Sequence, residues 1–229
     1  MRPRHPLPLA CALALALGCA SGTAATRGAT LTTDARCYAQ GAPLRLTAGG
    51  LAPEAPLVVS LDGQALSYRD GSSPETDSAG TFASSFATPA LAPGVAQARH
   101  LLSVSDGRRR PRARFTVTRP TGAAFQPASG DPRSLRARFS VWGFALAGGD
   151  ARVRVWLHWV DPAGRVQANA ALGTTGGDCG TLTTPPRRVF PFAPRAGRWT
   201  LVLDGQRRYR VQTDGPRAKI PVHVRSLAR

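Results

Sequence analysis

Short segments in which apolar and polar residues alternate recur along this chain, and turns rich in glycine, proline and Asp-Gly pairs separate them. In the segment 44–48, leucine and alanine alternate with arginine and threonine, and the segment 57–61 runs directly into Asp62-Gly63. Alternation of this kind places successive side chains on opposite faces of a strand. Beyond residue 25 the chain shows no long apolar repeat of about 3.6 residues, so the pattern predicts an all-β protein.

The predicted strands form two series. The first series, residues 28–118, has the strand spacing of an immunoglobulin-like β-sandwich. Its candidate strands are 44–48, 57–61, 81–87, 99–104 and 112–118. We expect a linker at residues 119–122, because Arg-Pro-Thr-Gly combines two residue types that interrupt regular structure.

The second series, residues 123–229, predicts another sandwich of similar size, so the expected fold is two immunoglobulin-like domains in tandem. Its candidate strands are 135–144, 151–160, 187–192, 199–203 and 219–225, and a hairpin turn is expected at 161–164. Trp159 is the best candidate for a buried indole in this domain, with Trp199 as its neighbour. The first series contains no tryptophan, so tryptophan fluorescence should report on the second domain alone.

The N-terminal residues 1–25 have a different pattern, with Arg2 and Arg4 before an apolar run at 7–17 and small residues at 22–25. This pattern is typical of a secretory signal peptide. The apolar run is shorter than the roughly 20 residues that span a bilayer, and no longer run follows. We therefore expect an exported protein without a transmembrane segment, located outside the cell, in the periplasm or on the cell surface.

The cysteines fit an oxidising compartment. Cys11 lies inside the predicted signal peptide, and Cys19 follows a sequence that resembles an imperfect lipoprotein box, so a lipid anchor at Cys19 is an alternative to secretion. Cys37 and Cys179 remain as an even pair in an oxidising compartment, which predicts a disulfide between the two domains.

A repeated short sequence leaves it open whether Cys37 and Cys179 pair. Cys37 precedes the Leu-Asp-Gly-Gln sequence at 61–64 by the same interval that separates Cys179 from the identical sequence at 203–206. If the repeat marks a duplication and not a coincidence, the two cysteines occupy equivalent places and have no particular reason to meet.

The chain is strongly basic, with 30 lysine and arginine residues and a formal net charge of +17. Lys219 is the only lysine, and most of the excess charge lies in residues 121–229. A positive surface favours anionic partners, and for an exported protein these are envelope polymers or acidic glycans and not nucleic acid. A solvated cationic surface without a partner is the alternative.

Residues with catalytic or metal-binding chemistry are sparse. His100, His158 and His223 are far apart, and no pair of histidines or cysteines has ligand spacing. The glycine-rich loop 176–180 around Cys179 lacks the context of a catalytic nucleophile. Acidic residues occur singly, mostly in turns. We therefore expect no metal, no cofactor and no enzymatic activity.

One face of the second domain combines cations with an indole. In the predicted strands 151–160, 199–203 and 219–225, strand alternation separates an apolar set from an outward set. If these strands share one sheet, as in immunoglobulin-like domains, their outward sides and adjoining residues form a candidate surface for an anionic polymer or acidic glycan. Its residues are Arg152, Arg154, Trp156, His158, Arg198, Lys219, His223 and Arg225. Burial of Trp156 against the first domain is the alternative.

Two resemblances follow from these segments. Residues 50–53 (Gly-Leu-Ala-Pro) and 77–82 (Asp-Ser-Ala-Gly-Thr-Phe) resemble motifs of bacterial surface immunoglobulin-like domains. Residues 177–182 and 198–204 are similar to segments of uncharacterised secreted proteins of GC-rich bacteria. The resemblance implies a tandem immunoglobulin-like fold and export, but it brings no known activity and no functional residues.

Together these observations predict an exported, non-enzymatic binding or structural module of the cell envelope or extracellular space. Binding of anionic polymers by the second domain is the first alternative, and an enzyme with an unrecognised site is the second.

Export generates the first prediction. Mass spectrometry of protein recovered from a secreting host should give a mature terminus after Ala25, because small residues end the predicted signal peptide. A chain that still carries residues 1–25, or one lipidated at Cys19, would contradict this cleavage.

Overall fold

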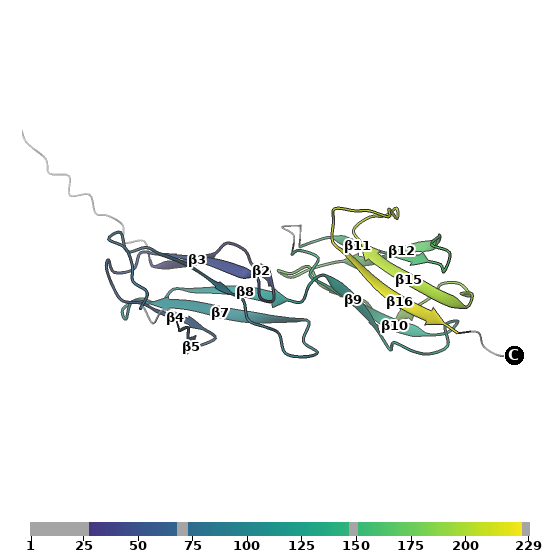
Figure 1. The fold of residues 1–229 in the computed structure, drawn as a ribbon, viewed down its shortest axis with the longest axis horizontal. Helices are drawn as coiled ribbons and strands as arrows, with labels where there is room; N and C mark the ends of the chain where they lie inside the picture. The colour runs from purple at the N-terminus through teal and green to yellow at the C-terminus, as the bar shows by residue number, and fades with distance from the viewer. Residues whose placement is uncertain (1–27, 68–72, 147–150, 226–229) are drawn as a thin grey trace, which may run out of the picture.

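The computed structural model describes residues 28–67, 73–146 and 151–225 of the 229-residue chain. It shows an all-β molecule in which two β-sandwiches follow one another along one long axis (Figure 1). Within the described ranges there is no helix, and hence none that could span a membrane. The predicted signal peptide, including Cys19, lies outside the described residues.

The first domain packs the sheet β1-β3-β6 against the sheet β2-β8-β7-β4-β5. Its strands are β1 (Thr30–Thr33), β2 (Cys37–Ala39), β3 (Pro43–Gly49), β4 (Val58–Leu61), β5 (Gln64–Ala65), β6 (Phe82–Ala87), β7 (Gln97–Ser105) and β8 (Arg112–Thr118). Strand β2 runs parallel to β8, and the other pairs are antiparallel. Leu44 and Leu46 of β3 share one core with Phe115 and Val117 of β8 because each alternating set points between the sheets.

The second domain packs a sheet centred on β10, which pairs with β9, β13 and β14, against the sheet β12-β11-β15-β16. Its strands are β9 (Gly122–Gln126), β10 (Arg136–Trp142), β11 (Arg154–Val160), β12 (Val166–Thr174), β13 (Leu182–Thr183), β14 (Arg187–Arg188), β15 (Gly197–Asp204) and β16 (Arg217–Val224). The hairpin turn expected after β11 connects it to β12.

The two indoles expected in the second core are there. Trp159 and Trp199 are 3% and 2% exposed, and each still satisfies its N–H group. Trp159 Nε1 donates to the Val189 carbonyl at 2.7 Å, and Trp199 Nε1 donates to the Arg195 carbonyl at 2.9 Å. A buried indole without an acceptor would destabilise the core, so these bonds determine where the irregular segment between β14 and β15 can pass.

Most predicted strands are present, but the structure also contains β1, β2, β5, β9, β12 and β13, which were not predicted, and two boundaries differ. Strand β12 was not predicted because its alanine-rich sequence has low β propensity; pairing with β11 overrides that preference. The predicted strand 187–192 ends after Arg188, since Val189 and Phe190 leave the sheet and enter the core. Gly122, expected in the linker, begins β9.

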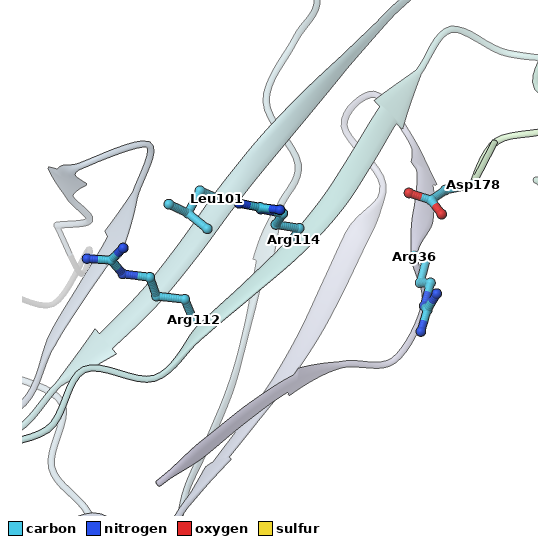
Figure 2. Close-up of a pocket in the computed structure, with 5 residues that line it drawn as sticks. All are labelled: Arg36, Leu101, Arg112, Arg114 and Asp178. Carbon is cyan, nitrogen blue, oxygen red and sulfur yellow. The ribbon is translucent and has the colours of Figure 1, made fainter.

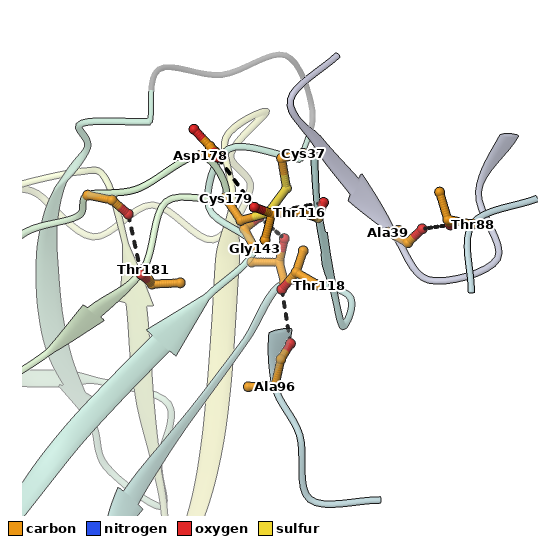
Figure 3. Close-up of a disulfide and its surroundings, with 12 residues drawn as sticks. Cys37, Ala39, Thr88, Ala96, Thr116, Thr118, Gly143, Asp178, Cys179 and Thr181 are labelled. Atoms are coloured by element: carbon orange, nitrogen blue, oxygen red, sulfur yellow. Dashed lines mark hydrogen bonds between the residues drawn. A yellow bond between two sulfur atoms is a disulfide. The ribbon is translucent and has the colours of Figure 1, made fainter. Parts of the chain in front are cut away.

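A disulfide joins the domains, as predicted from the cysteine pair. Cys37, at the start of β2, is bonded to Cys179, in the turn 177–180 of the second domain, and their Cα atoms are 5.1 Å apart (Figure 3). The two repeated sequences occupy different places, one in the β4–β5 hairpin and the other at the end of the interior strand β15. The repeated sequence therefore does not mark equivalent positions in the two domains, and Cys37 and Cys179 are free to pair.

The linker is also held against the second domain. Trp142 Nε1 donates to the Pro120 carbonyl at 3.1 Å, and Thr121 Oγ1 donates to the Gly143 carbonyl at 2.8 Å. The Trp142 ring lies so close to Gly122 that a Cβ there would come within 2.7 Å of it. A side chain at position 122 would thus displace the indole that braces the linker.

The covalent link generates a stability prediction. The double variant Cys37→Ser/Cys179→Ser should unfold in two separate transitions, because each domain has its own core and the long closed loop is released. By the chain-entropy estimate the disulfide contributes up to ~5 kcal/mol to the free energy of unfolding. Calorimetry of the variant and of reduced wild type should give the same two transitions. A single transition at the temperature of the oxidised protein would contradict a stabilising link.

Candidate anion-binding surfaces

The three strands predicted to share the basic face are neighbours in one sheet. Strand β11 pairs with β15, and β15 pairs with β16. One outward row runs from Trp156 through Asp204 to Arg217, and the next runs from His158 through Val202 to Lys219. The predicted arrangement of these strands is confirmed.

The eight predicted residues do not form one patch. Arg198 lies opposite His223 at one end of the sheet, whereas Trp156 lies opposite Asp204, six residues further along β15. At about 3.4 Å per residue the two ends are roughly 20 Å apart. The exposed Arg198, His223 and Arg225 form one group, the exposed Arg152 and Arg154 lie at the Trp156 end, and Lys219 lies between the ends.

The prediction that His158 is exposed is wrong. Its side chain is completely buried, and its Nε2 lies 3.2 Å from Asp204 Oδ1 and 3.0 Å from the Gln206 carbonyl. The segment 205–216 between β15 and β16 folds back over this part of the outer face. The Tyr209 ring meets the imidazole with centroids 5.6 Å apart. Strand alternation alone does not show that a loop covers the outward side.

Trp156 is half-buried, and cations of its own domain occupy its ring. The guanidiniums of Arg154 and Arg207 lie 5.4 Å and 5.8 Å from the ring centroid. These cation–π contacts use the aromatic surface that a sugar or base would need. The expected stacking platform is therefore already covered by arginine.

Opposite Trp156, the buried carboxylate of Asp204 neutralises the positive charge of Arg217. Arg217 donates to Asp204 Oδ2 through Nε at 3.1 Å and Nη2 at 2.6 Å. Burial by itself raises the pKa of Asp204, but hydrogen bonds from His158, the Gln206 amide and Arg217 outweigh it and lower the pKa. This part of the face is a closed internal network.

A different surface has cations without partners. A hollow of about 510 Å³ opens where the outer face of the β2-β8-β7 sheet meets the second domain. Figure 2 shows the residues that line it: Arg36, Leu101, Arg112, Arg114 and Asp178. We call it the junction groove.

Three elements build the junction groove. Strand alternation in β8 directs Arg112 and Arg114 outward, and Leu101 of β7 pairs with Arg114. Arg36 immediately precedes the disulfide cysteine of β2. Asp178 comes from the second domain, on the turn that carries Cys179, and its Oδ2 accepts a hydrogen bond from Thr116 Oγ1 at 3.3 Å.

The groove is electrostatically unbalanced. Across the described residues, the guanidiniums of Arg36, Arg112 and Arg114 make no hydrogen bond or ion pair, and all three side chains are exposed. Asp178 is the one acid that lines the groove. Guanidiniums offer paired donors that match carboxylate and phosphate oxygens, so the groove is suited to an anion.

Sequence reasoning missed this groove, although part of its signal was present. The alternation of Arg112, Arg114 and Thr116 in the predicted strand 112–118 already places both arginines on one face. Nothing in the sequence shows that Arg36 and Asp178 come beside them. No three histidine, cysteine or acidic side chains gather as a metal site in the described ranges.

No protein-family model and no curated protein matches this chain. Among solved structures it is similar to Rst D1-D2, with 13% identity and a TM-score of 0.34 over 86% of this chain and 99% of that chain. It is also similar to the native conformation of E. coli alpha-2-macroglobulin, with 16% identity and a TM-score of 0.32 over 85% of this chain. The match spans 14% of the macroglobulin chain.

The buried Asp204 network generates a pH prediction. Asp204→Asn should lower the free energy of unfolding of the second domain by about 3 kcal/mol at pH 7, because it removes one partner of a buried charge pair. Since the folded-state pKa of Asp204 lies below its ordinary 3.8, its contribution is present above about pH 4 and is lost as pH falls through the folded-state pKa.

The difference between wild type and Asp204→Asn should therefore shrink below pH 4 when unfolding is followed by tryptophan fluorescence. Asp214→Asn, which changes an exposed acid in the segment 205–216 that follows Asp204, is the matched control and should change stability little at any pH. A difference for Asp204→Asn that stays constant down to pH 2 would contradict the ionised network.

Proposed function

We propose that this chain is an exported, non-enzymatic binding module that holds an anionic polymer of the cell envelope or extracellular space in the junction groove. The observation that carries the proposal is the set of three guanidiniums without partners, from Arg36, Arg112 and Arg114, around one hollow. Charge-assisted hydrogen bonds from arginine to carboxylate or phosphate are among the strongest that a protein surface offers.

The spacing of the cations favours a polymer over a single small anion. Arg112 and Arg114 are alternate residues of β8, so their backbones are about 7 Å apart. Arg36 immediately precedes Cys37, which pairs with Thr116 across the parallel strands β2 and β8. Arg36 therefore lies beside this row, at the end near Arg114, on the neighbouring strand. A row of separated cations can bind several charges of one chain at once, which increases avidity.

The rigid junction supports the same function. The disulfide attaches the turn that carries Asp178 to the strand that follows Arg36. A groove whose walls are already held in place loses less conformational entropy when it binds than one made from free loops. A disulfide also fits an oxidising location outside the cytoplasm.

Binding by the outer face of the second domain is the second candidate. Exposed Arg152, Arg154 and Lys219 favour it. The contacts of Trp156 with two arginines and the pairing of Arg217 with Asp204 favour the groove instead.

Binding of defined polyanions tests the proposal. Arg112→Ala/Arg114→Ala should weaken binding of polygalacturonate or polyphosphate at least about tenfold at 150 mM salt, because two charge-assisted contacts are lost. The control Arg108→Ala/Arg110→Ala removes the same charge from exposed positions on the β7–β8 loop and should change the Kd less than about twofold.

Fluorescence anisotropy with labelled polymer gives the Kd values. An equal loss in both double variants would mean that only net charge matters and would contradict the groove. A loss confined to Arg152→Ala/Arg154→Ala/Arg198→Ala would place binding on the second domain instead.

A further inference from the structure

A second hollow opens at the end of the second domain that lies away from the disulfide. Figure 1 shows β16 running toward this end, where the described chain terminates. The hollow has a volume of about 710 Å³ and lies between the β9–β10 sheet and β16. We call it the distal pocket.

The strand register explains why the sandwich is open here. Strand β9 ends at Gln126, opposite Arg138 of β10, and the chain then leaves the sheet in the segment 127–135. Strand β16 continues to Val224, whose side chain points inward with that of Val222. The two layers are therefore not closed by a strand pair at this end, and the segment 127–135 passes around the opening.

The floor of the distal pocket is apolar and reaches the core. Val189 and Phe190 line it and are 1% and 2% exposed. Phe125, Leu135 and Val222 also line it but remain only partly buried. An apolar body placed against these three side chains would remove their remaining surface from water, which is favourable.

The charges at the rim are arranged on opposite sides. His223 and Arg225 are exposed on the β16 side and make no ion pair within the described residues. Asp131 lies on the loop side, where its oxygens accept hydrogen bonds from the Arg133 amide at 3.0 Å and Ser134 Oγ at 2.8 Å. These bonds lower the pKa of Asp131 and engage both of its oxygens. His223 and Arg225 are thus the rim side chains that can pair with an anionic ligand, on the side of the pocket opposite Asp131.

We propose that the distal pocket binds a small amphipathic carboxylate, with its hydrocarbon body against Phe125, Phe190 and Val222 and its carboxylate at Arg225 and His223. An apolar pocket with a few polar groups at its mouth is the common form of a small-molecule site. The volume of this pocket lies within the range of about 300–1,000 Å³ that such sites have.

The core provides a reporter for binding. Phe190 meets the Trp199 ring edge-on with centroids 5.3 Å apart, and the Val189 carbonyl accepts the hydrogen bond from Trp159. A ligand against these two residues changes the surroundings of both indoles. All four tryptophans belong to the second domain, so the fluorescence signal comes from the domain that contains the pocket.

Titration with laurate, dodecanol and dodecylamine, each below its micelle-forming concentration, tests the proposal on the full mature chain. Laurate should bind saturably at one site and at least about fivefold more tightly than dodecanol, because its carboxylate gains a charge-assisted contact. Arg225→Gln should reduce the affinity for laurate to that for dodecanol. Lys219→Gln, which removes an exposed cation six residues before Arg225 and opposite Val202, is the matched control and should leave binding unchanged.

Ala128→Phe places a large side chain at the exposed rim without adding a tryptophan and should block laurate and dodecanol alike. Tighter binding of dodecylamine than laurate would overturn the assignment of an anionic ligand. Unchanged binding in both Arg225→Gln and Ala128→Phe, or no saturable binding by wild type, would overturn the site. The variant Arg112→Ala/Arg114→Ala should bind laurate normally, so failure of the junction groove and failure of the distal pocket are distinguishable.

Discussion

The covalent bond between Cys37 and Cys179 is the constraint on which the relation of the two domains depends. Each domain has its own core and is joined to the other by only a short linker. The disulfide adds a second connection, and it places the turn 177–180 of one domain against β2 and β8 of the other (Figure 3). The junction groove exists because this turn cannot leave the sheet that it covers.

Pairing of charges, more than net charge, distinguishes the surfaces of this protein. The second half of the chain has the larger excess of arginine, yet several of its cations are engaged. Asp204 is bonded to Arg217, Asp161 is paired with Arg195, and Trp156 is covered by two guanidiniums. The first domain is less basic, but its arginines at the junction groove face solvent without a partner. An anion gains most where no carboxylate already competes for the guanidinium.

A feature of the site could be predicted from the sequence where it depends on neighbouring residues, and not where it depends on contacts between distant segments. The alternation in β8 is local, so the common face of Arg112 and Arg114 was accessible from the sequence. The burial of His158 depends on the segment 205–216 crossing the outer face of a sheet, a contact between residues far apart in the chain. Strand β12 shows the same limit, since its alanine-rich sequence forms a strand only because β11 offers an unpaired edge.

The class of structure follows from the local pattern of apolar and polar residues. A period of two places apolar side chains on one face of each strand, and burial of those faces requires two packed sheets in each domain. Two cysteines outside the N-terminal region predicted a disulfide, and the structure decided the pairing that the repeated Leu-Asp-Gly-Gln sequence had left open. Tertiary structure alone decided which cations remain exposed, where a loop covers a face and where the two layers separate. Those features depend on distances between segments remote in sequence, which no local pattern contains.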